Sequence, residues 1–330
     1  MATVLITGGT GLIGSALTKA LLNHSYNVII LSRQTSIREP RRNFAPPRPD
    51  ADSPDSYQVG QPVTGNLSYA EWNLKDQTID NDAIANTDYI IHLAGAGVAD
   101  KRWTKKRKQE IVDSRVKSGE LIIRSLKENN NKVKAILSSS GIGWYGPDPV
   151  IPNRNPFTEN DPAGDDFLGQ TCKMWEGSLG PVTTLAKRSV VFRTGIVLST
   201  EGGAFKEFKK PVRFGVAAIL GNGRQIISWI HIDDLVRLYI AAIENDNISG
   251  VYNAVAPNPA SNKYFTVQLA KASKGKFFIP VYVPSFILKL VLGEMSVEVL
   301  KSATVSCKKI LDTGFTFLYP SIDAALKDLK

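Results

Sequence analysis

The feature that most constrains the fold is a glycine-rich loop near the start of the chain. Residues 3–6 (Thr-Val-Leu-Ile) are typical of a buried strand, and residues 12–23 have the apolar periodicity of a helix. The loop between them, residues 8–14, reads Gly-Gly-Thr-Gly-Leu-Ile-Gly. Such glycine spacing is weak alone, but between a strand and a helix it indicates a dinucleotide-binding unit.

Each glycine has a distinct expected role in this loop. Gly8 permits a sharp turn, Gly11 lets the backbone approach a pyrophosphate, and Gly14 lets the helix pack closely on the strand. The free amides and the positive end of the helix dipole would then hold the diphosphate. The loop residues expected to contact the dinucleotide are Gly8, Thr10, Gly11, Leu12, Ile13 and Gly14.

The end of the second expected strand indicates which dinucleotide is bound. Proteins that read NAD place Asp or Glu there to bind the ribose 2′-hydroxyl. This chain has Ser32 and Arg33 instead. A hydroxyl and a planar guanidinium match a 2′-phosphate through charge-assisted hydrogen bonds, whereas a carboxylate would repel it. We therefore expect NADP(H), with Ser32 and Arg33 among the cofactor-binding residues.

Strand-like and helix-like segments alternate over roughly the first two hundred residues. This alternation predicts an α/β fold with a Rossmann-type, doubly wound parallel sheet. Strands are expected at 3–7, 27–31, 88–94, 133–138, 190–198 and 251–255. Helices are expected at 12–23, 103–127 and 167–179, and from Asp233 or Asp234 to about Glu244.

Residues 38–66 differ from the rest, because they contain six prolines, four arginines and few large apolar groups. They predict a long surface loop, either a tolerated insertion or a flap whose Arg38, Arg41 or Arg42 touches the adenosine phosphate. We expect this loop to lie within a cofactor-binding domain, 1–257. A smaller, α-rich C-terminal lobe, 258–330, would cover one side of the cleft with helices at 266–273, 285–303 and 322–329.

Composition narrows the class of protein. Cys172 and Cys307 are the only cysteines, so neither a disulfide framework nor a cysteine metal site is expected. The chain has no secretory signal pattern and no apolar run long enough to span a bilayer, which predicts a cytoplasmic protein without a membrane partner. The net charge is +9, but the basic cluster at 101–108 contains no interleaved aromatic other than Trp103, and no nucleic-acid motif follows it. Nucleic acid is therefore disfavoured, and anionic small molecules are preferred.

Several motifs together resemble the extended short-chain dehydrogenase/reductase superfamily. They are the loop from Thr7 to Gly11, the turn His92-Leu93-Ala94-Gly95, and the serines 138–140 before Tyr145. Within it, the chain is similar to the atypical epimerase family group, NAD-dependent epimerase/dehydratase-like proteins with a short C-terminal domain. That likeness rests on residues 164–168, 172, 175–176, 193–195, 229–234, 253–259, 293–295 and 314–320.

The resemblance implies further contacts to the cofactor. Arg115 stands where many extended members carry Asn, and it could reach the cofactor or a neighbouring strand while paired with Glu110. Val197 falls at the strand end beside the nicotinamide. His92 is expected to be a satisfied polar residue rather than a ligand. The cofactor contacts added in this way are Leu93, Ala94, Gly95, Glu110, Arg115 and Val197.

The resemblance does not extend to the usual proton-transfer residues. Superfamily dehydrogenases use a Tyr, with a Lys four residues later that lowers its pKa. When the matching helix is aligned on Glu176, Leu168 occupies the Tyr position and Cys172 the Lys position. Both groups are therefore missing. A Cys172 nucleophile is disfavoured, because no His or Arg lies close in sequence to form a thiolate.

Three residues are the remaining catalytic candidates. Ser139 or Ser140 could hydrogen-bond a substrate carbonyl, or could simply be satisfied hydroxyls at a strand end. Tyr145 could supply a phenol, but without a nearby cation its pKa should stay near 10, and a packing aromatic is the alternative.

Two functions of different classes remain open. The first is an oxidoreductase or nucleotide-sugar-epimerase-like protein that moves a hydride between NADP(H) and a carbonyl or alcohol of a small molecule. The second is an NADP(H)-binding regulator or scaffold with little turnover. A hydrolase is excluded because there is no Gly-x-Ser-x-Gly elbow before a helix. The resemblance also implies a homodimer formed through the helices at 103–127 and 167–179.

Overall fold

The computed structural model of the chain describes residues 1–33 and 65–329. Apart from residues 65–66, the Pro- and Arg-rich segment 38–66 lies outside the described residues. Its predicted loop, and the roles suggested for Arg38, Arg41 and Arg42, therefore stay predictions. Within the described ranges, no helix is both long enough and apolar enough to cross a membrane.

The centre of the molecule is an eight-stranded sheet in the order β12-β7-β6-β5-β1-β2-β3-β4. Neighbouring strands run parallel, except that β4 pairs antiparallel with β3 at one edge. The strands are β1 (Thr3–Thr7), β2 (Asn27–Ser32), β3 (Leu67–Asn73), β4 (Thr78–Ile79), β5 (Tyr89–His92), β6 (Ala135–Gly141), β7 (Arg188–Thr194) and β12 (Gly250–Ala254).

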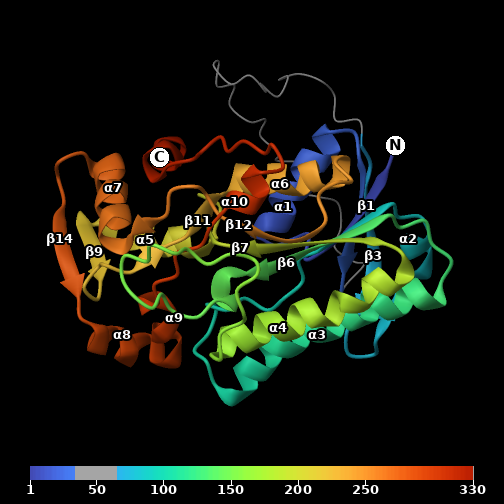
Figure 1. Cartoon of the computed structure of the whole chain (residues 1–330), viewed down its shortest axis with the longest axis horizontal. Coiled ribbons are helices and arrows are strands. Elements are labelled where there is room, and N and C mark those ends of the chain that lie inside the picture. The colour runs from blue at the N-terminus through green and yellow to red at the C-terminus, as the bar shows by residue number, and fades with distance from the viewer. Residues whose placement is uncertain (34–64, 330) are drawn as a thin grey trace.

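Helices cover both faces of this sheet (Figure 1). Helices α1 (Leu12–Asn23) and α6 (Ile232–Glu244) pack together on one face. Helices α2 (Asn81–Ala85), α3 (Lys105–Glu128) and α4 (Phe167–Leu179) cover the other. Each layer closes its own apolar core against the sheet. The doubly wound α/β fold expected from the sequence is thus confirmed.

The order of strands reverses beside β1, and this reversal determines where a ligand-binding crevice can form. From β1 the chain adds β2 and β3 on one side, and then crosses to add β5, β6 and β7 on the other. Ligands of such sheets bind in the crevice outside the carboxyl ends of the strands at this switch point. The glycine loop leaves β1 at that point.

A second lobe lies beyond the β12–β7 side of the sheet, at the left of Figure 1. In it, β9 pairs in parallel with β14, and α5 packs on α7. This lobe therefore contains segments that precede residue 257 as well as segments that follow it. The domain boundary expected at residue 257 stays a prediction. The elements here are β8 (Ile196–Leu198), α5 (Gly203–Arg213), β9 (Val216–Leu220), β10 (Ile226–Ile227), β11 (Trp229–His231), β13 (Ala260–Ser261), α7 (Asn262–Lys274), β14 (Ile279–Val283), α8 (Ser285–Leu292), α9 (Ser296–Leu300) and α11 (Ile322–Asp328). Helix α10 (Lys308–Leu311) instead packs on β12 of the central sheet.

One sequence-based expectation about secondary structure is wrong, and one strand of the sheet was missed. The single helix expected over 285–303 ends at Leu292, because Gly293 adopts a φ of +62° that turns the chain. Residues 302–305 then run through the interior, and Val305 bridges to Phe157. Strand β3 was not expected, since its stability comes from parallel pairing with β2 rather than from a local pattern.

Buried polar contacts fasten the lobe to the sheet domain. The carboxylate of Asp148, in the loop after β6, accepts hydrogen bonds from Asn153 Nδ2 (2.9 Å), Ser302 Oγ (2.7 Å) and the Thr304 amide (3.0 Å). Asp166 caps α4, because its Oδ1 accepts a hydrogen bond from the Gly169 amide at 2.7 Å. Its other oxygen lies 3.0 Å from Lys301 Nζ.

Candidate functional site

The glycine loop has the geometry that its sequence predicts. Gly8 adopts a φ of +72°, and its carbonyl accepts from the Gly11 amide at 3.0 Å. A Cβ at Gly14 would lie 2.3 Å from Gly8 O, so α1 can rest on the loop only because Gly14 lacks a side chain. No side chain caps the start of α1 at Gly11. The amides of its first turn therefore remain available to an anion.

A buried hydroxyl joins the end of β1 to the turn after β5. Thr7 Oγ1 accepts from the amides of Leu93 and Ala94, both at 3.1 Å, and lies 2.8 Å from His92 Nδ1. Ser118 Oγ is 3.2 Å from His92 Nε2 on the other side of the ring. Burial lowers the pKa of His92 to about 4, so the imidazole is neutral. The expectation of a satisfied, non-ligating His92 is confirmed.

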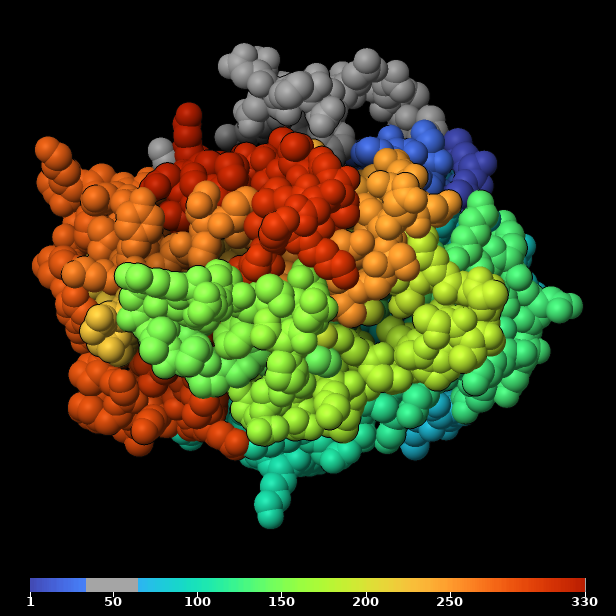
Figure 2. Space-filling model, viewed as in Figure 1, coloured from blue at the N-terminus to red at the C-terminus, as the bar shows by residue number. Residues whose placement is uncertain are grey.

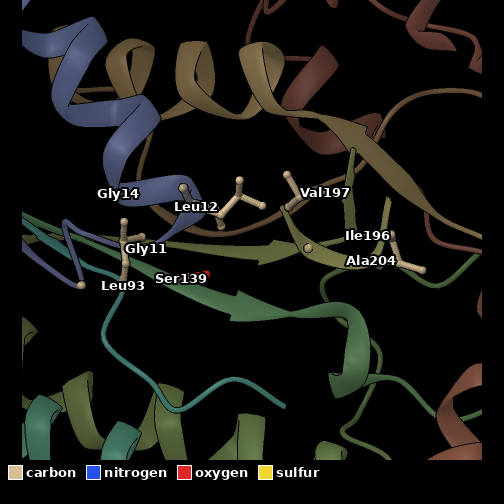
Figure 3. Close-up of a pocket in the computed structure, with 11 residues that line it drawn as sticks. Gly11, Leu12, Gly14, Leu93, Ser139, Ile196, Val197 and Ala204 are labelled. Carbon is tan, nitrogen blue, oxygen red and sulfur yellow. The ribbon is translucent and has the colours of Figure 1, made fainter. Parts of the chain in front are cut away.

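A cavity of about 350 Å³ opens beside the loop, within the size range of small-molecule sites (Figure 3). The expected residues in its lining are Gly8, Gly11, Leu12, Ile13, Gly14, Leu93, Ser139 and Val197. Ile196, Gly203 and Ala204 complete it and were not expected. The paired glycines 202–203, four residues after the end of β8, were the sequence signal that could have found them.

The remaining cofactor candidates lie around this cavity rather than in its lining. Ser32 and Arg33 stand at the carboxyl end of β2, next to β1, with Ser32 buried and Arg33 exposed. Thr10 is exposed in the loop, and Ala94 is buried in the turn after β5. Residues that bind an adenosine phosphate belong at the β2 strand end in this fold.

The expected pairing of Glu110 with Arg115 is wrong. Arg107 Nη1 lies 2.7 Å from Glu110 Oε2, and the two are three positions apart on α3. Arg115 instead donates to the carbonyls of Ala96 and Ile111, each at 3.0 Å. Its guanidinium packs so closely on Gly95 that a Cβ there would lie 2.9 Å away. Arg115 thus supports the turn after β5, whereas the exposed Glu110 is absent from the cavity lining.

Of the three catalytic candidates, only Ser139 reaches the cavity. Its hydroxyl is 3.2 Å from the carbonyl oxygen of Ser140. Ser140 Oγ instead donates to Glu176 Oε1 at 2.7 Å. Ser139 is therefore the candidate that could bind a substrate oxygen, and Ser140 belongs to a structural network.

That network is a buried ion pair between β7 and α4, which sequence reasoning missed. Arg193 donates through Nε to Glu176 Oε1 (2.9 Å) and through Nη2 to Glu176 Oε2 (3.0 Å). The guanidinium carbon lies 3.5 Å from the centre of the Trp144 ring. Such a fork is the strongest geometry for a guanidinium and a carboxylate. Arg193 directly follows the apolar run 190–192 of β7, and this was the only sequence signal of a buried partner.

The assignment of Tyr145 as a catalytic phenol is corrected. Its ring is fully buried, its hydroxyl donates to Asn253 Oδ1 at 2.6 Å, and Arg193 Nη1 donates to it at 3.2 Å. A cation is thus close by, contrary to expectation, yet burial raises the pKa of Tyr145 to about 12. This phenol is a packing and hydrogen-bonding group beneath the site.

The two replaced superfamily positions are apolar or unreactive. Leu168 packs against Gly143, because a Cβ added at Gly143 would lie only 3.0 Å from the Cβ of Leu168. Cys172 is buried, and burial raises the pKa of its thiol to about 11, so no thiolate forms at neutral pH. Neither residue can exchange a proton with a substrate.

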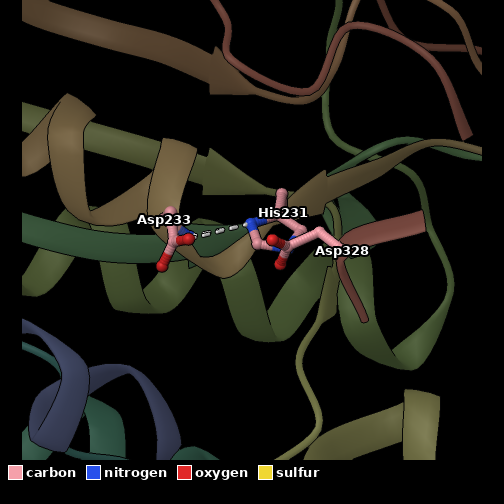
Figure 4. A group of neighbouring side chains, drawn as sticks. All are labelled: His231, Asp233 and Asp328. Carbon is pink, nitrogen blue, oxygen red and sulfur yellow. Dashed lines mark hydrogen bonds and ion pairs between the residues drawn. The ribbon is translucent and has the colours of Figure 1, made fainter. Parts of the chain in front are cut away.

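A separate cluster joins the last helix to α6 (Figure 4). His231 caps α6, because its Nδ1 accepts from the Asp233 amide at 3.2 Å, and its Nε2 lies 3.2 Å from Asp328 Oδ2. A neutral imidazole has only one free lone pair, and here the amide uses it. A metal bound to Nε2 would require that hydrogen bond to break. The hydrogen bond from His231 lowers the pKa of Asp328, which fits a structural contact.

Comparisons with known proteins agree with this geometry. Residues 4–166 match the NAD dependent epimerase/dehydratase family, and residues 283–329 match a domain of unknown function, DUF1731. An epimerase family protein of Staphylococcus saprophyticus is 35% identical over 98% of both chains. The chain therefore belongs to the NAD dependent epimerase/dehydratase family, among the epimerase family proteins.

Solved structures extend the likeness to the whole fold. The human epimerase family protein SDR39U1, solved with NADPH, is 27% identical, with a TM-score of 0.79 over 99% of this chain and 98% of that one. UDP-glucuronic acid 4-epimerase from Bacillus cereus, solved with UDP-glucuronic acid and NAD, has a TM-score of 0.73 at 20% identity, over 99% and 98% of the two chains. The second likeness is one of fold alone.

We expect Gly14→Ala to destabilise the protein by about 1–3 kcal/mol, because its Cβ would meet the backbone of Gly8 and force α1 away from β1. Gly177→Ala in α4 is the matched control, since a Cβ there has nothing within 4 Å. It should be neutral or stabilising by up to about 1 kcal/mol. Urea unfolding measures both changes, and equal effects of the two variants would contradict the close approach.

The neutral His92 also predicts a pH dependence of stability. An unfolded histidine titrates near 6.5, and the buried one near 4. As the pH falls between these values, only the unfolded chain takes up the proton. The free energy of unfolding should therefore fall by up to about 3 kcal/mol from this group below pH 6.5. Urea unfolding of wild type and His92→Asn measures it; parallel pH profiles for the two would overturn the assignment.

Proposed function

We propose that this protein binds NADP(H) in the crevice above β1 and β5 and acts as an oxidoreductase or nucleotide-sugar-epimerase-like enzyme. Its substrate would be a carbonyl or alcohol of a small, anionic molecule. The observation that carries the proposal is one continuous lining, from the uncapped first turn of α1 to Ser139 and Val197. Family membership supports the reaction class.

The residues present fit the cofactor. The approach of the backbone at Gly8 and Gly11 leaves room for a diphosphate, and the amides at the start of α1 would bind it. Ser32 and Arg33 would hold the 2′-phosphate at the end of β2. The NADPH bound by the human relative supports this choice of cofactor. When bound, NADP(H) supplies a hydride.

The chain's own residues would orient the reactants. Leu93 and Val197 face the cavity from opposite sides and would exclude water from it (Figure 3). Ser139 would donate a hydrogen bond to the substrate oxygen as charge develops there. Of the described lining residues, Ser139 alone has a polar side chain.

A second candidate function is an NADP(H)-binding regulator or scaffold with little turnover. The observation that favours it is the state of the usual proton-transfer positions, because Leu168 cannot titrate and Cys172 is a buried neutral thiol. Cytoplasmic location and a homodimer through α3 and α4 are further proposals, drawn from the sequence and the resemblance alone.

Cofactor choice is tested by titrating the protein with NADPH and NADH. We expect NADPH to bind more tightly, and Arg33→Ala to weaken NADPH binding roughly tenfold or more through loss of a charge-assisted fork while leaving NADH unchanged. Arg154→Ala, another exposed arginine, is the control. Tighter binding of NADH, or equal loss in both arginine variants, would refute the assignment.

Catalysis is tested with NADPH and a panel of aldehydes, ketones and nucleotide sugars. Ser139→Ala should lower kcat roughly 100-fold, the cost of losing one donor to a developing oxyanion. Tyr145→Phe should cost about 1–3 kcal/mol of stability but leave kcat near wild type. The reverse pattern would reassign the catalytic group. Tight NADPH binding with no turnover on any substrate would favour the regulator.

A further inference from the structure

A band of exposed apolar side chains follows the outer edge of the C-terminal lobe. Phe214 and Phe277 are 86% and 88% exposed at one end of β14, and Leu290 is 75% exposed on α8. Strand β14 and helix α8 follow one another along this edge of the molecule (Figures 1 and 2). The band, called here the apolar edge, consists of Phe214, Phe277, Ile279, Val281, Phe286 and Leu290.

The fold does not require these side chains to be apolar. Strand β14 pairs on one side only, with β9, and Leu288 is the one fully buried residue of α8. The i, i+4 pair Phe286 and Leu290 therefore points away from the lobe. Several large apolar side chains exposed along one edge of a protein are typical of an interaction site.

The segment that carries most of the apolar edge has charge of one sign. Residues 247–293 contain five lysines and no Asp, Glu or Arg. Lys274 and Lys276 directly precede Phe277, and Lys289 directly precedes Leu290; all three are exposed. An apolar band flanked by lysines is complementary to a partner that has an anionic outer layer over an apolar interior.

We propose that the apolar edge docks the protein onto an anionic membrane surface. Phe277, Phe286 and Leu290 would enter the boundary between headgroups and acyl chains, and the lysines would meet lipid phosphates. This revises the sequence-based expectation of no membrane partner, which rested on the absence of a spanning segment. A surface contact depends on which apolar residues are exposed, and hydropathy does not reveal that.

The charges disfavour the other occupants. In a symmetric dimer the same patch faces itself, so Lys274, Lys276 and Lys289 of two copies would be brought together. Nucleic acid would meet the lysines but leave the protruding aliphatic side chains in water. A side chain as exposed as Phe277, at 88%, can enter the lipid boundary without any rearrangement of the lobe.

The experiment is co-sedimentation of the full chain with vesicles of phosphatidylcholine alone or mixed with phosphatidylglycerol. We expect binding to the anionic vesicles that weakens with salt. Phe286→Ser with Leu290→Ser should reduce partitioning roughly tenfold or more, through lost apolar contact. Lys274→Glu with Lys276→Glu should reduce it at least as much, since each lysine near an anionic surface contributes on the order of fivefold.

Lys127→Glu with Lys134→Glu, near the far end of α3, changes the net charge equally away from the apolar edge and should leave partitioning unchanged. Circular dichroism checks that each variant folds. The proposal is overturned if anionic vesicles are not bound, or if this control variant loses binding as much as the edge variants. It is also overturned if the apolar variant turns a dimer into a monomer by light scattering, because the edge would then join two copies.

Discussion

The crevice depends on how closely three backbone segments approach one another. Helix α1 rests on Gly8 and Gly9 so tightly that a Cβ at Gly14 would lie 2.3 Å from a carbonyl oxygen, and a Cβ at Gly8 would lie 3.0 Å from the carbonyl carbon of Leu93. The Thr7 hydroxyl then fastens the turn after β5 to the end of β1. These contacts hold the first amides of α1 beside the cavity.

A second constraint is a buried ion pair that connects β7 to α4. The Arg193–Glu176 pair is buried, and burying charges is costly unless every hydrogen-bonding group is used. Here Ser140, Tyr145 and the carbonyl of Glu159 complete the set. The pair thereby joins the ends of β6 and β7 to α4, and Tyr145 links it to β12 through Asn253. Because these polar groups satisfy one another, none of them is available to exchange protons with a ligand.

The sequence predicted what local motifs determine and missed what distant partners determine. The glycine loop, Leu93, Ser139 and Val197 meet at one cavity because strand ends of a parallel sheet converge. Glu110 was misassigned because Arg107, one turn away on the same helix face, is better placed than Arg115 five residues on. The cation beside Tyr145 comes from β7, 48 residues later, and no spacing rule indicates it.

The electrostatics of the cavity therefore come from the backbone. Its described lining has no charged side chain, yet two helices begin there: α1 after Gly11, and α5 with Gly203 and Ala204 in the wall. Neither start is capped by a side chain, so both present the positive end of a helix dipole. A neutral substrate oxygen gains little from such a field, whereas an oxygen that becomes negative gains more. The tyrosine and lysine positions are occupied by Leu168 and Cys172. In the proposed function, the helix ends and Ser139 would therefore stabilise the charge that develops on the substrate oxygen.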